Sequence, residues 1–503
     1  MHREIFINVA QHEKRVAILE NKRIEEFYVE RPDAVNLVGN IYKGRVESVL
    51  PGMGAAFVEL GLEKNGFLHV GDVVTGLSSF EKLFEDGADE EIERIEKNKP
   101  LPPITELLKK NDDVLVQVVK EPIGTKGARL TTHISIPGRF LVMMPFDNHI
   151  GLSKRIESRE ERDRIRKIME DLRLPKDIGF IVRTAAQGAS QKDFARESRY
   201  LLNLWHHIKA RARRAKPPCL IHQEYDIILR IARDIFTSDV SRFEIDSKGD
   251  FKRVSRFLRI LAPHLRPRLR FYGDRMPMFE KFEIERQIEK IYNRIVQLKS
   301  GGYLIFDQTE SLVAIDVNSG KFVGKRNLED TAFKTNMEAA EEVPRQLKLR
   351  DLGGIIIIDF IDMEFADHRR SVFKTLERNL EGDKAKTKIL NISSIGLVEM
   401  TRQRMRKSIE GKSYQKCPYC NGRGIVKSVS TVAIELTRKL EKFLAESKAR
   451  EVFVSLNPEV AYYISAPERN MTRPLERRFH KAIRVIEDPN LHTEEIKIEE
   501  RKA

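Results

Sequence analysis

Apolar and polar positions alternate in short runs along the first part of the chain. Residues 3–30 contain three such runs with polar breaks between them, which predicts a β-meander. Residues 39–71 give short strands separated by glycines at close intervals, a pattern typical of a small barrel. An acidic, proline-containing insert from about Ser78 to Asn111 interrupts this pattern. The apolar run that begins at Asp113 is expected to close the barrel.

The pattern then changes from alternation to helical spacing. A mixed α/β stretch from about Gly127 to Ile208 precedes the basic segment 209–218, which we take as a domain boundary. Further on, apolar residues three and four positions apart predict a single helix over residues 279–298. The face of this helix consists of Ile284, Ile288, Ile291, Ile295 and Leu298.

Strands and helices alternate in the next part of the chain. Residues 303–320 predict a hairpin, and a helix is expected over residues 328–349, with a kink or an early end at Pro344. A strand over 355–359 and a helix over 367–381 follow. This order favours an α/β architecture with parallel strands that are buried on both faces. The last 75 residues are mixed and charged, and their pattern predicts little.

Length and composition indicate several domains, because 503 residues are too many for one hydrophobic core. A formal net charge of +14 favours nucleic acid as a partner over a membrane, since no Lys-rich amphipathic helix is found. A protein that is basic without such a partner is the alternative. No apolar run approaches about 18 residues, and the first residues lack the apolar core of a signal peptide. With only three cysteines, we expect a cytoplasmic protein in a reducing compartment.

Two apolar runs end on a carboxylate, Asp316 and Asp359. If their strands are neighbours, both side chains converge on one crevice at the edge of the sheet. Such a pair suits Mg²⁺, which can polarise a phosphoryl oxygen and activate water for phosphodiester hydrolysis. Asn318 lies on the same side as Asp316, where its amide can donate to a phosphate or orient water. The alternative is that the aspartates cap a helix or form a turn. Asp362 is a further candidate ligand, less favoured because it lies past the end of the apolar run.

Cys417 and Cys420 have the C-x₂-C spacing that supplies half of a tetrahedral zinc site. A redox role is the competing interpretation, although no thioredoxin-like βαβ pattern is recognised around the motif. The chain contains no second C-x₂-C pair. Either Cys219 and His222 supply the missing ligands, or two copies of the chain share one zinc through four sulfurs. The second option predicts a homodimer.

Two further groups have the chemistry to contact nucleic acid. Phe57 and Phe67 lie among the barrel strands, where exposed aromatic rings can stack on bases, unless both belong to the core. Basic residues stand near them in the sequence: Lys43, Arg45 and Lys64. Arg183 and Thr184 end a strand, and a guanidinium beside a hydroxyl can hold a terminal phosphate. A surface polar pair without such a role is the alternative.

Several segments resemble signatures of the ribonuclease E/G family. They are "AIDVNSG" (314–320), "RQLKLRDLGGIIIIDFIDM" (345–363), "GLVEMTRQR" (396–404) and "CPYCNGRG" (417–424). Residues 39–61 are similar to the S1 domain of the family, and 124–135 to the segment after it. The resemblance covers residues 1 to about 430, and the last 75 residues match only loosely.

The resemblance implies roles for particular residues. Asp316 and Asp359 match a catalytic Mg²⁺ pair, and Asn318 matches the residue that orients the scissile phosphate. Cys417 and Cys420 match a zinc-link in which two chains share one structural Zn²⁺. RNA-binding residues are implied at Phe57, Phe67 and Lys126. A pocket for a 5′-monophosphate is implied at Gly138, Val142, Arg183, Thr184 and Lys386. At Lys386 the best-known pocket has arginine, so that the charge is kept but the bidentate fork is lost.

The implied fold is a multidomain α/β and α+β protein. Its parts are an RNase H-like subdomain (1–38 and 216–280), an inserted S1 or OB-fold barrel (39–125), a 5′-sensor domain (126–215), a DNase I-like catalytic domain (281–408), the zinc-link (409–426) and a small C-terminal domain (427–503). The expected partners are single-stranded RNA and a second copy of the chain, with a tetramer as a further option. No membrane and no small-molecule cofactor are expected.

The implied function is that of a Mg²⁺-dependent endoribonuclease that cuts single-stranded, A/U-rich RNA and leaves 5′-phosphate and 3′-hydroxyl ends. Stimulation by a substrate 5′-monophosphate and roles in rRNA maturation and mRNA decay follow from the resemblance alone. One alternative is a non-catalytic S1-type RNA-binding protein. Another is a metal-dependent enzyme that acts on small phosphate compounds.

Overall fold

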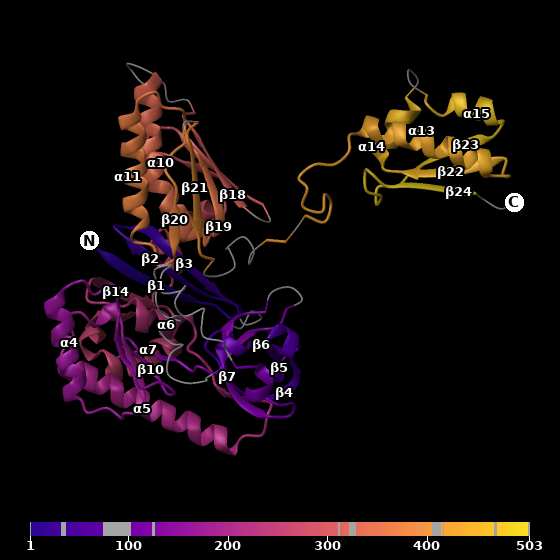
Figure 1. The fold of residues 1–503 in the computed structure, drawn as a ribbon. Coiled ribbons are helices and arrows are strands. Elements are labelled where there is room, and N and C mark those ends of the chain that lie inside the picture. Colours follow the sequence, from indigo (N-terminus) through magenta and orange to yellow (C-terminus); the bar gives the residue numbers. More distant parts are fainter. Residues whose placement is uncertain are drawn as a thin grey trace. The chain divides into compact units, whose positions relative to one another are not determined.

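The computed structural model describes residues 2–31, 37–73, 102–122, 126–309, 312–320, 328–393, 395–404, 414–415, 417–466 and 470–500. The chain divides into two compact units, Met1–Ile409 and Glu410–Ala503 (Figure 1). Most of the insert expected at Ser78 to Asn111 falls outside the described residues, and its described end contains a short helix, α3 (Ile104–Leu107). In the described part of the chain, no helix combines the length and the apolar character needed to cross a membrane.

The predicted β-meander is confirmed and forms three strands of a five-stranded sheet. Its strands are β1 (Arg3–Val9), β2 (Lys14–Glu20) and β3 (Arg23–Glu30), joined by β14 (Val240–Ile245) and β15 (Leu269–Phe271) in the order β15-β14-β1-β2-β3. The alternation buries both faces. Ile5 and Ile7 pack in a core with α6 (Ile227–Asp234) and α7 (Lys248–Leu261), whereas Phe6 packs with α8 (Met278–Lys281) and α9 (Ile284–Ile291).

The predicted barrel is also confirmed. Its strands are β4 (Ile41–Leu50), β5 (Ala55–Glu59), β6 (Gly66–His69), β8 (Arg129–Thr131) and β7 (Asp113–Lys120), paired in that order, and β7 pairs with β4 to close the cylinder. Two glycines make the close approach of β6 and β8 possible. A Cβ atom on Gly127 would lie 1.8 Å from the carbonyl oxygen of Asn65, and one on Gly66 would lie 2.4 Å from Leu130.

A smaller sheet follows the barrel in the sequence. Its strands are β11 (Ile150–Leu152), β12 (Gly179–Val182), β10 (Leu141–Met144) and β9 (Ile136–Pro137), in that order, with helices α4 (Arg159–Asp171) and α5 (Gln191–Arg214) packed against them. Basic residues at the carboxyl end of α5 belong to its last turn, where positive charge is favourable beside the free carbonyl groups. The basic segment that we take as a boundary therefore lies inside a helix up to Arg214.

The third sheet of the first unit carries the two aspartates. Its strands are β16 (Ile295–Gln297), β17 (Tyr303–Gln308), β18 (Leu312–Asn318), β19 (Gly354–Asp359), β21 (Leu397–Arg402) and β20 (Thr387–Ile389), in that order. The predicted β17–β18 hairpin is confirmed. Helices α10 (Leu328–Arg350) and α11 (Ala366–Leu380) share one core with one face of the sheet, as Figure 1 shows.

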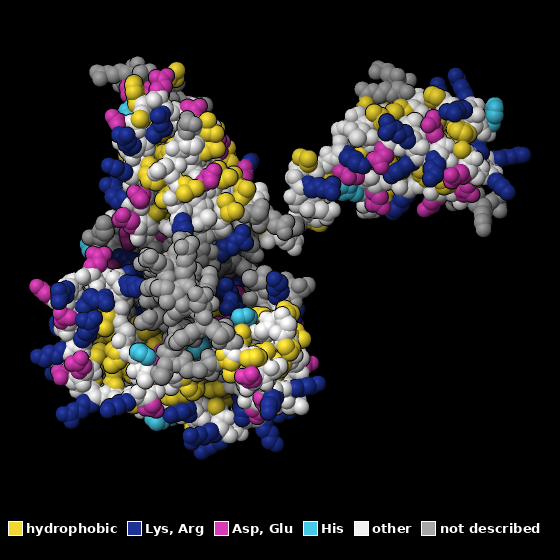
Figure 2. All heavy atoms as spheres, viewed as in Figure 1, with side chains coloured by type: hydrophobic (Ala, Val, Ile, Leu, Met, Phe, Trp, Pro, Cys, Tyr) yellow, Lys and Arg dark blue, Asp and Glu magenta, His cyan; other side chains and the backbone are white. Residues whose placement is uncertain are grey.

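The expectation of parallel strands buried on both faces is wrong for this sheet. Only β18 and β19 pair in parallel, while the other neighbouring strands are antiparallel. Ile356 and Ile358 are buried under the helices, whereas Ile355 on the opposite face is 52% exposed. Figure 2 shows hydrophobic and acidic side chains together at the surface in this region. We call this second face, which carries Asp316 and Asp359, the open face.

Two local predictions fail for physical reasons. The helix expected over 279–298 is replaced by α8, α9 and strand β16, because Glu283 adopts a left-handed conformation (φ 54°) and Ile295 pairs with Ile305 of β17. Strand pairing outweighs the helical spacing of the apolar residues there. The early end at Pro344 is also wrong, since α10 continues to Arg350. Buried core contacts on both sides of Pro344 hold the helix together despite the missing amide hydrogen.

The second unit has its own hydrophobic core. It contains α13 (Val429–Glu446), β22 (Glu451–Leu456), α14 (Pro458–Ser465), α15 (Arg473–Phe479), β23 (Ala482–Glu487) and β24 (Ile496–Glu500). The strand order is β23-β22-β24, with β22 and β23 parallel and β24 antiparallel. A small α/β domain therefore forms where the sequence pattern predicted little.

A buried ion pair at the edge of the third sheet is expected to contribute strongly to stability. Arg402 in β21 contacts Asp383 at 2.7 Å, and both side chains are only 4% exposed. Arg402 also donates to the carbonyl of Leu352 at 2.6 Å. Asp383→Ala should lower the free energy of unfolding by about 3–5 kcal/mol, because it leaves a buried guanidinium without its counter-charge. Urea unfolding followed by circular dichroism measures the loss.

Asp367→Ala is the matched control, since Asp367 is 89% exposed and, among the described residues, its side chain pairs only with Arg370 one helical turn away. Its effect should stay within about 0.5 kcal/mol. Equal losses for the two variants would contradict a special contribution of the buried pair.

Candidate functional site

The structure places Asp316 and Asp359 side by side. Their strands β18 and β19 are parallel neighbours, and the two aspartates are direct partners in the register. Both lie on the open face, at the carboxyl ends of their strands. Asn318, two positions after Asp316, points to the same face and donates its amide to Oδ2 of Asp316 at 2.7 Å. The three residues named from the sequence pattern therefore form one group.

The carboxylates of this group repel each other. Burial raises the pKa of Asp359, and the charges of Asp316 and Asp362 raise it further. In the described part of the chain, neither Asp316 nor Asp359 has a cationic partner, and Asp359 accepts no hydrogen bond. This disfavours a purely structural use as a cap or a turn, because such a use would give the carboxylates donors. Their expected partner is a cation.

A cavity of about 720 Å³ opens beside Asp359. It is lined by the two residues after β18, the start of α10 and the loop after β19, which brings Asp362 to the same space. Glu329 in its wall accepts the backbone N–H of Glu364 at 2.9 Å and contacts Nδ1 of His368 at 2.7 Å. Burial raises the pKa of Glu329, but these donors outweigh it and lower the pKa overall. Glu329 therefore ties this loop to α10.

The sequence pattern had no signal for Glu329 or His368, because their contacts join two helices through a loop. Among the described residues, no group of three or more His, Cys, Asp or Glu side chains is arranged to hold a metal ion. The site offers two neighbouring carboxylates. That donor set fits Mg²⁺, which commonly takes one or two carboxylates and keeps several waters.

The aromatic pair of the barrel lies on its outer surface. Phe57 and Phe67 are direct partners across β5 and β6, with ring centroids 6.0 Å apart in an edge-to-face arrangement. Both rings are half-buried, whereas their neighbours Ala56 and Leu68 point into the core. The alternative that both phenylalanines are core residues is therefore wrong.

Two cations continue the row of the aromatic pair. Phe67 is the partner of Arg129 in β8, and Arg129 is the partner of Lys120 in β7. Lys126 is exposed in the segment that leads into β8. Arg129 forms an ion pair with Asp72 at 2.9 Å, and Arg45, a cation named from the sequence, contacts Asp113 at 3.4 Å. Arg129 could not be found from spacing, since only the closure of the barrel brings it beside Phe67.

Four of the five residues expected in the phosphate pocket, all except Lys386, lie where β10 and β12 meet the preceding loop. Nη1 of Arg183 donates to the carbonyl of Gly138 at 2.6 Å and to Asp234 at 2.5 Å. The hydroxyl of Thr184 contacts that of Ser153 at 3.1 Å. Val142 is buried in β10. Lys386 is exposed just before β20, in the sheet of the aspartates.

Glu197 of α5 holds the loop at Gly138 through hydrogen bonds to its backbone. It accepts the backbone N–H groups of Phe140 at 2.9 Å and of Leu141 at 3.1 Å, and burial raises its pKa to about 7. A Cβ atom on Gly138 would lie 2.1 Å from a carboxylate oxygen of Glu197, so that only glycine fits there. Neither Glu197 nor Asp234 was predicted, because both reach the pocket from distant helices.

The cysteine pair lies in a tight turn of the second unit. The backbone N–H of Gly424 donates to Sγ of Cys420 at 3.3 Å, and this bond is the main cause of the lowered pKa of the Cys420 thiol. Asn421, Gly422 and Gly424 have positive φ values of 51°, 81° and 74°, which curl the chain around the sulfur. Such a turn supplies two thiolates of a tetrahedral set, and the described chain adds no third ligand.

The other proposed ligands lie in the first unit. Cys219 and His222 belong to strand β13 (Cys219–His222), which pairs with β4 of the barrel. All three cysteines are free thiols. The turn that contains Cys420 packs within the second unit, where the ring of Tyr419 contacts that of His492 with centroids 4.0 Å apart.

Comparison with known proteins identifies relatives over the whole chain. A sequence model of the ribonuclease E/G family matches residues 135–405, and a model of the thioredoxin-like domain of RNase E/G matches residues 416–501. Ribonuclease G of Escherichia coli (strain K12) is 41% identical over 498 residues, which cover 99% of each chain. Ribonuclease G of Haemophilus influenzae is 41% identical over 94% of each chain. Ribonuclease E of E. coli is 35% identical over 97% of this chain and 45% of its own length.

These matches correct two expectations about the end of the chain. The last residues do not match loosely, since they lie within a domain model of their own. The cysteines lie within the residues that match the thioredoxin-like domain model, and β22, α14, α15 and β23 form a βαβ unit that the sequence pattern did not reveal. The cysteines precede α13, outside this unit. Redox chemistry therefore stays as the competing interpretation of the pair.

The repulsion at Asp359 has a consequence for stability. In EDTA at pH 7, Asp359→Asn should raise the free energy of unfolding, by at most about 1 kcal/mol because the charges are partly screened by solvent. The folded state raises the pKa of this carboxyl above 3.8, so that ionisation costs more in the folded than in the unfolded chain. The penalty is present above the folded pKa and disappears as the pH falls below 3.8. Thermal unfolding between pH 4 and 8 should show a gain that shrinks toward low pH.

Asp367→Asn, at an exposed aspartate of the same sheet's covering helix, should bring no comparable gain. A gain for Asp359→Asn that stays constant with pH would contradict electrostatic repulsion as its cause.

Proposed function

The chain belongs to the ribonuclease E/G family, and we propose that it is an endoribonuclease that cuts single-stranded RNA at the Asp316–Asp359 pair. The observation that carries the proposal is the register of β18 and β19, which sets two carboxylates side by side on an exposed face. Neither carboxylate has a cationic partner among the described residues. Relatives named ribonuclease G and ribonuclease E support the same reaction. The preferred substrate in this proposal is A/U-rich RNA.

Asp316 and Asp359 are the residues that would hold Mg²⁺. When bound there, Mg²⁺ supplies charge stabilisation at a phosphoryl oxygen and acidifies water. The protein's own part is positional. Asn318 fixes one carboxylate through its amide and has a second N–H with which to orient the scissile phosphate. Attack by water on phosphorus with departure of the 3′ oxygen would leave 5′-phosphate and 3′-hydroxyl ends.

Substrate binding is proposed for the outer face of the barrel. The half-exposed rings of Phe57 and Phe67 offer surfaces on which bases can stack, worth about 1–3 kcal/mol for each base. Lys126 is exposed in the segment that leads into β8, the strand that pairs with β6, and can contact the phosphate backbone. The net charge of +14 favours the approach of a polyanion in general.

Recognition of a 5′-monophosphate is proposed for Gly138, Val142, Arg183 and Thr184. One end of the Arg183 guanidinium is held by the protein, and the hydroxyl of Thr184 lies next to it in the chain. Lys386 would add a further positive charge without a planar fork. A preference for 5′-monophosphorylated RNA, and roles in rRNA maturation and mRNA decay, complete the proposal.

The proposed assembly is a homodimer, or a tetramer made of two dimers, in which Cys417 and Cys420 of two chains share one structural Zn²⁺. The lowered pKa of the Cys420 thiol supports a thiolate ligand. Free thiols at all three cysteines support a reducing compartment, and we place the protein in the cytoplasm.

The central test compares wild type with Asp316→Asn and Asp359→Asn on a labelled, A/U-rich, single-stranded RNA in Mg²⁺. Each variant should lower kcat/KM about 1,000-fold, because each removes one of two negative charges that hold the cation. EDTA should stop the wild-type reaction, and excess Mg²⁺ should restore it. Sequencing of the products reports whether the new 5′ ends carry phosphate.

Asp367→Asn in α11 is the matched control and should cut at the wild-type rate, since its carboxylate is exposed and is not among the residues that line the cavity. Tight binding of the RNA without any cleavage would support the non-catalytic alternative. Cleavage by Asp316→Asn at the wild-type rate would show that the metal site is misplaced.

The shared zinc predicts a ratio of about one Zn²⁺ for two chains. Cys417→Ser and Cys420→Ser should each lose the metal and shift the protein from dimer to monomer, since each variant removes two of four sulfurs at a shared site. Elemental analysis and analytical ultracentrifugation measure the two effects.

Cys219→Ser is the matched control and should keep both the zinc and the dimer. Loss of zinc from Cys219→Ser would support the alternative in which Cys219 and His222 complete the site within one chain. A dimer that persists in Cys417→Ser without zinc would contradict the zinc-link.

A further inference from the structure

The described residues hold the guanidinium of Arg183 through a single nitrogen, Nη1. Nη1 donates to the carboxylate of Asp234 at 2.5 Å and to the carbonyl of Gly138 at 2.6 Å. In the described part of the chain, Nε and Nη2 of Arg183 have no hydrogen-bond partner, and the side chain is 33% exposed. The edge that remains is the two-donor fork with which arginine binds phosphate in a bidentate manner.

Asp234 is itself held in place by a second arginine. Nη2 of Arg233 contacts Oδ2 of Asp234 at 3.0 Å, and Nε contacts Oδ1 at 3.2 Å. The Arg233 side chain is only 6% exposed. The guanidinium of Arg233 therefore binds both oxygens of the Asp234 carboxylate, and Oδ1 also accepts the hydrogen bond from Arg183.

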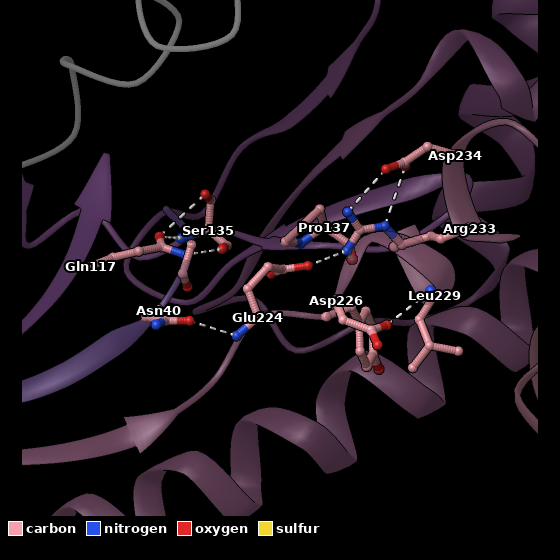
Figure 3. Close-up of polar contacts among 12 residues, drawn as sticks. Asn40, Gln117, Ser135, Pro137, Glu224, Asp226, Leu229, Arg233 and Asp234 are labelled. Atoms are coloured by element: carbon pink, nitrogen blue, oxygen red, sulfur yellow. Dashed lines mark hydrogen bonds and ion pairs between the residues drawn. The ribbon is translucent and has the colours of Figure 1, made fainter. Parts of the chain in front are cut away.

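Arg233 is fixed in turn by acceptors from two elements. Its Nη1 donates to Glu224 at 2.7 Å and to the carbonyl of Pro137 at 3.1 Å. The backbone N–H of Glu224 donates to Oδ1 of Asn40 at 2.9 Å, which ties Glu224 to the start of the barrel. Figure 3 shows Arg233 between Glu224, Pro137 and Asp234, with Asn40 beyond Glu224.

The charges along this chain of contacts alternate and sum to zero. Glu224 and Asp234 are negative, and Arg233 and Arg183 are positive. Burial raises the pKa of Asp234, but the two arginines outweigh burial and lower it, so that the carboxylate stays ionised at neutral pH. Both arginines also hold carbonyls of the same loop, at Pro137 and Gly138. The network thus fixes the loop and the guanidinium together.

We propose that Asp234 is a positioning residue for 5′-end recognition, which holds Nη1 of Arg183 so that the Nε–Nη2 edge faces the terminal phosphate. The inference rests on the proposed recognition of a 5′-monophosphate by Arg183. Asp234 touches no substrate and acts only through Arg183, while Arg233 keeps Asp234 in its orientation. The ability of the enzyme to distinguish RNA ends then depends on a carboxylate of the same sign as the ligand.

Two effects of removing this carboxylate have opposite signs. If only net charge mattered, Asp234→Asn would make the pocket more positive and would strengthen phosphate binding. If position matters, the same variant weakens the hold on Nη1 and lets the guanidinium turn away. The direction of the change therefore distinguishes the two explanations.

The experiment measures kcat/KM on two short RNAs of the same sequence that carry either a 5′-monophosphate or a 5′-hydroxyl. The quantity of interest is the ratio of the two values, because it cancels effects on the catalytic site and on the amount of folded protein. Asp234→Asn should lower the ratio about tenfold, as expected for the loss of a charge-assisted hydrogen bond. Arg183→Ala should lower it at least as far.

Two further variants keep the test specific. Asp234→Asn in the Arg183→Ala background should change the ratio no further, since a positioning residue has nothing left to position. Arg233→Lys keeps the charge but loses the fork that grips Asp234, and should lower the ratio by a smaller factor. Asp163→Asn, an exposed aspartate of α4 that pairs with Arg166, is the matched control and should leave both rates unchanged. Thermal unfolding confirms that each variant is folded.

The outcomes separate the inference from the function on which it rests. A wild-type ratio of one, unaffected by Arg183→Ala, would overturn 5′-end recognition and the inference with it. A wild-type preference that Arg183→Ala abolishes but Asp234→Asn preserves or increases would overturn the inference alone. An additional drop in the double variant would show that Asp234 acts independently of Arg183 and would also overturn it.

Discussion

The parallel register of β18 and β19 is the constraint on which the candidate site depends. It makes Asp316 and Asp359 direct neighbours, at a place where the described chain supplies neither of them with a counter-charge. The cost is visible in the raised pKa of Asp359. A fold that keeps two like charges together must recover this free energy elsewhere, and it does so on the other face of the same sheet, where α10 and α11 bury its apolar side chains.

Burial of one face of the sheet also explains how strand β19 can contribute to both stability and chemistry. Side chains in a strand alternate between faces, so that Ile356 and Ile358 anchor β19 in the core while Ile355 and Asp359 stay on the open face. The edge of the sheet is pinned by the buried pair of Arg402 and Asp383. Rigid strands hold both carboxylates in a fixed geometry, and the one amide donor to Asp316, Asn318, also belongs to β18.

The sequence predicts those features that arise from local alternation or from a motif. The meander, the barrel, the β17–β18 hairpin and the approach of the two aspartates could all be foreseen from short runs of residues. The helix over 279–298 could not be excluded, because only pairing with β17 shows that Ile295 is in a strand. Arg129 beside Phe67, and Asp234 beside Arg183, are equally invisible in the sequence, since each contact joins segments that meet only in the folded chain.

The contrast between satisfied and unsatisfied polar groups indicates which residues have a function. Arg402 and Asp383 complete each other's hydrogen bonds, and their contribution is to stability. Arg183, by contrast, is held at Nη1, while its Nε–Nη2 edge has no partner among the described residues. The pair Asp316–Asp359 receives one amide hydrogen bond and no cation from the same part of the chain. Leaving polar groups half-satisfied costs free energy, and at an accessible site another molecule can supply the missing partner. A terminal phosphate at Arg183 and a divalent cation at the aspartates are the partners whose charge and geometry fit what each group lacks.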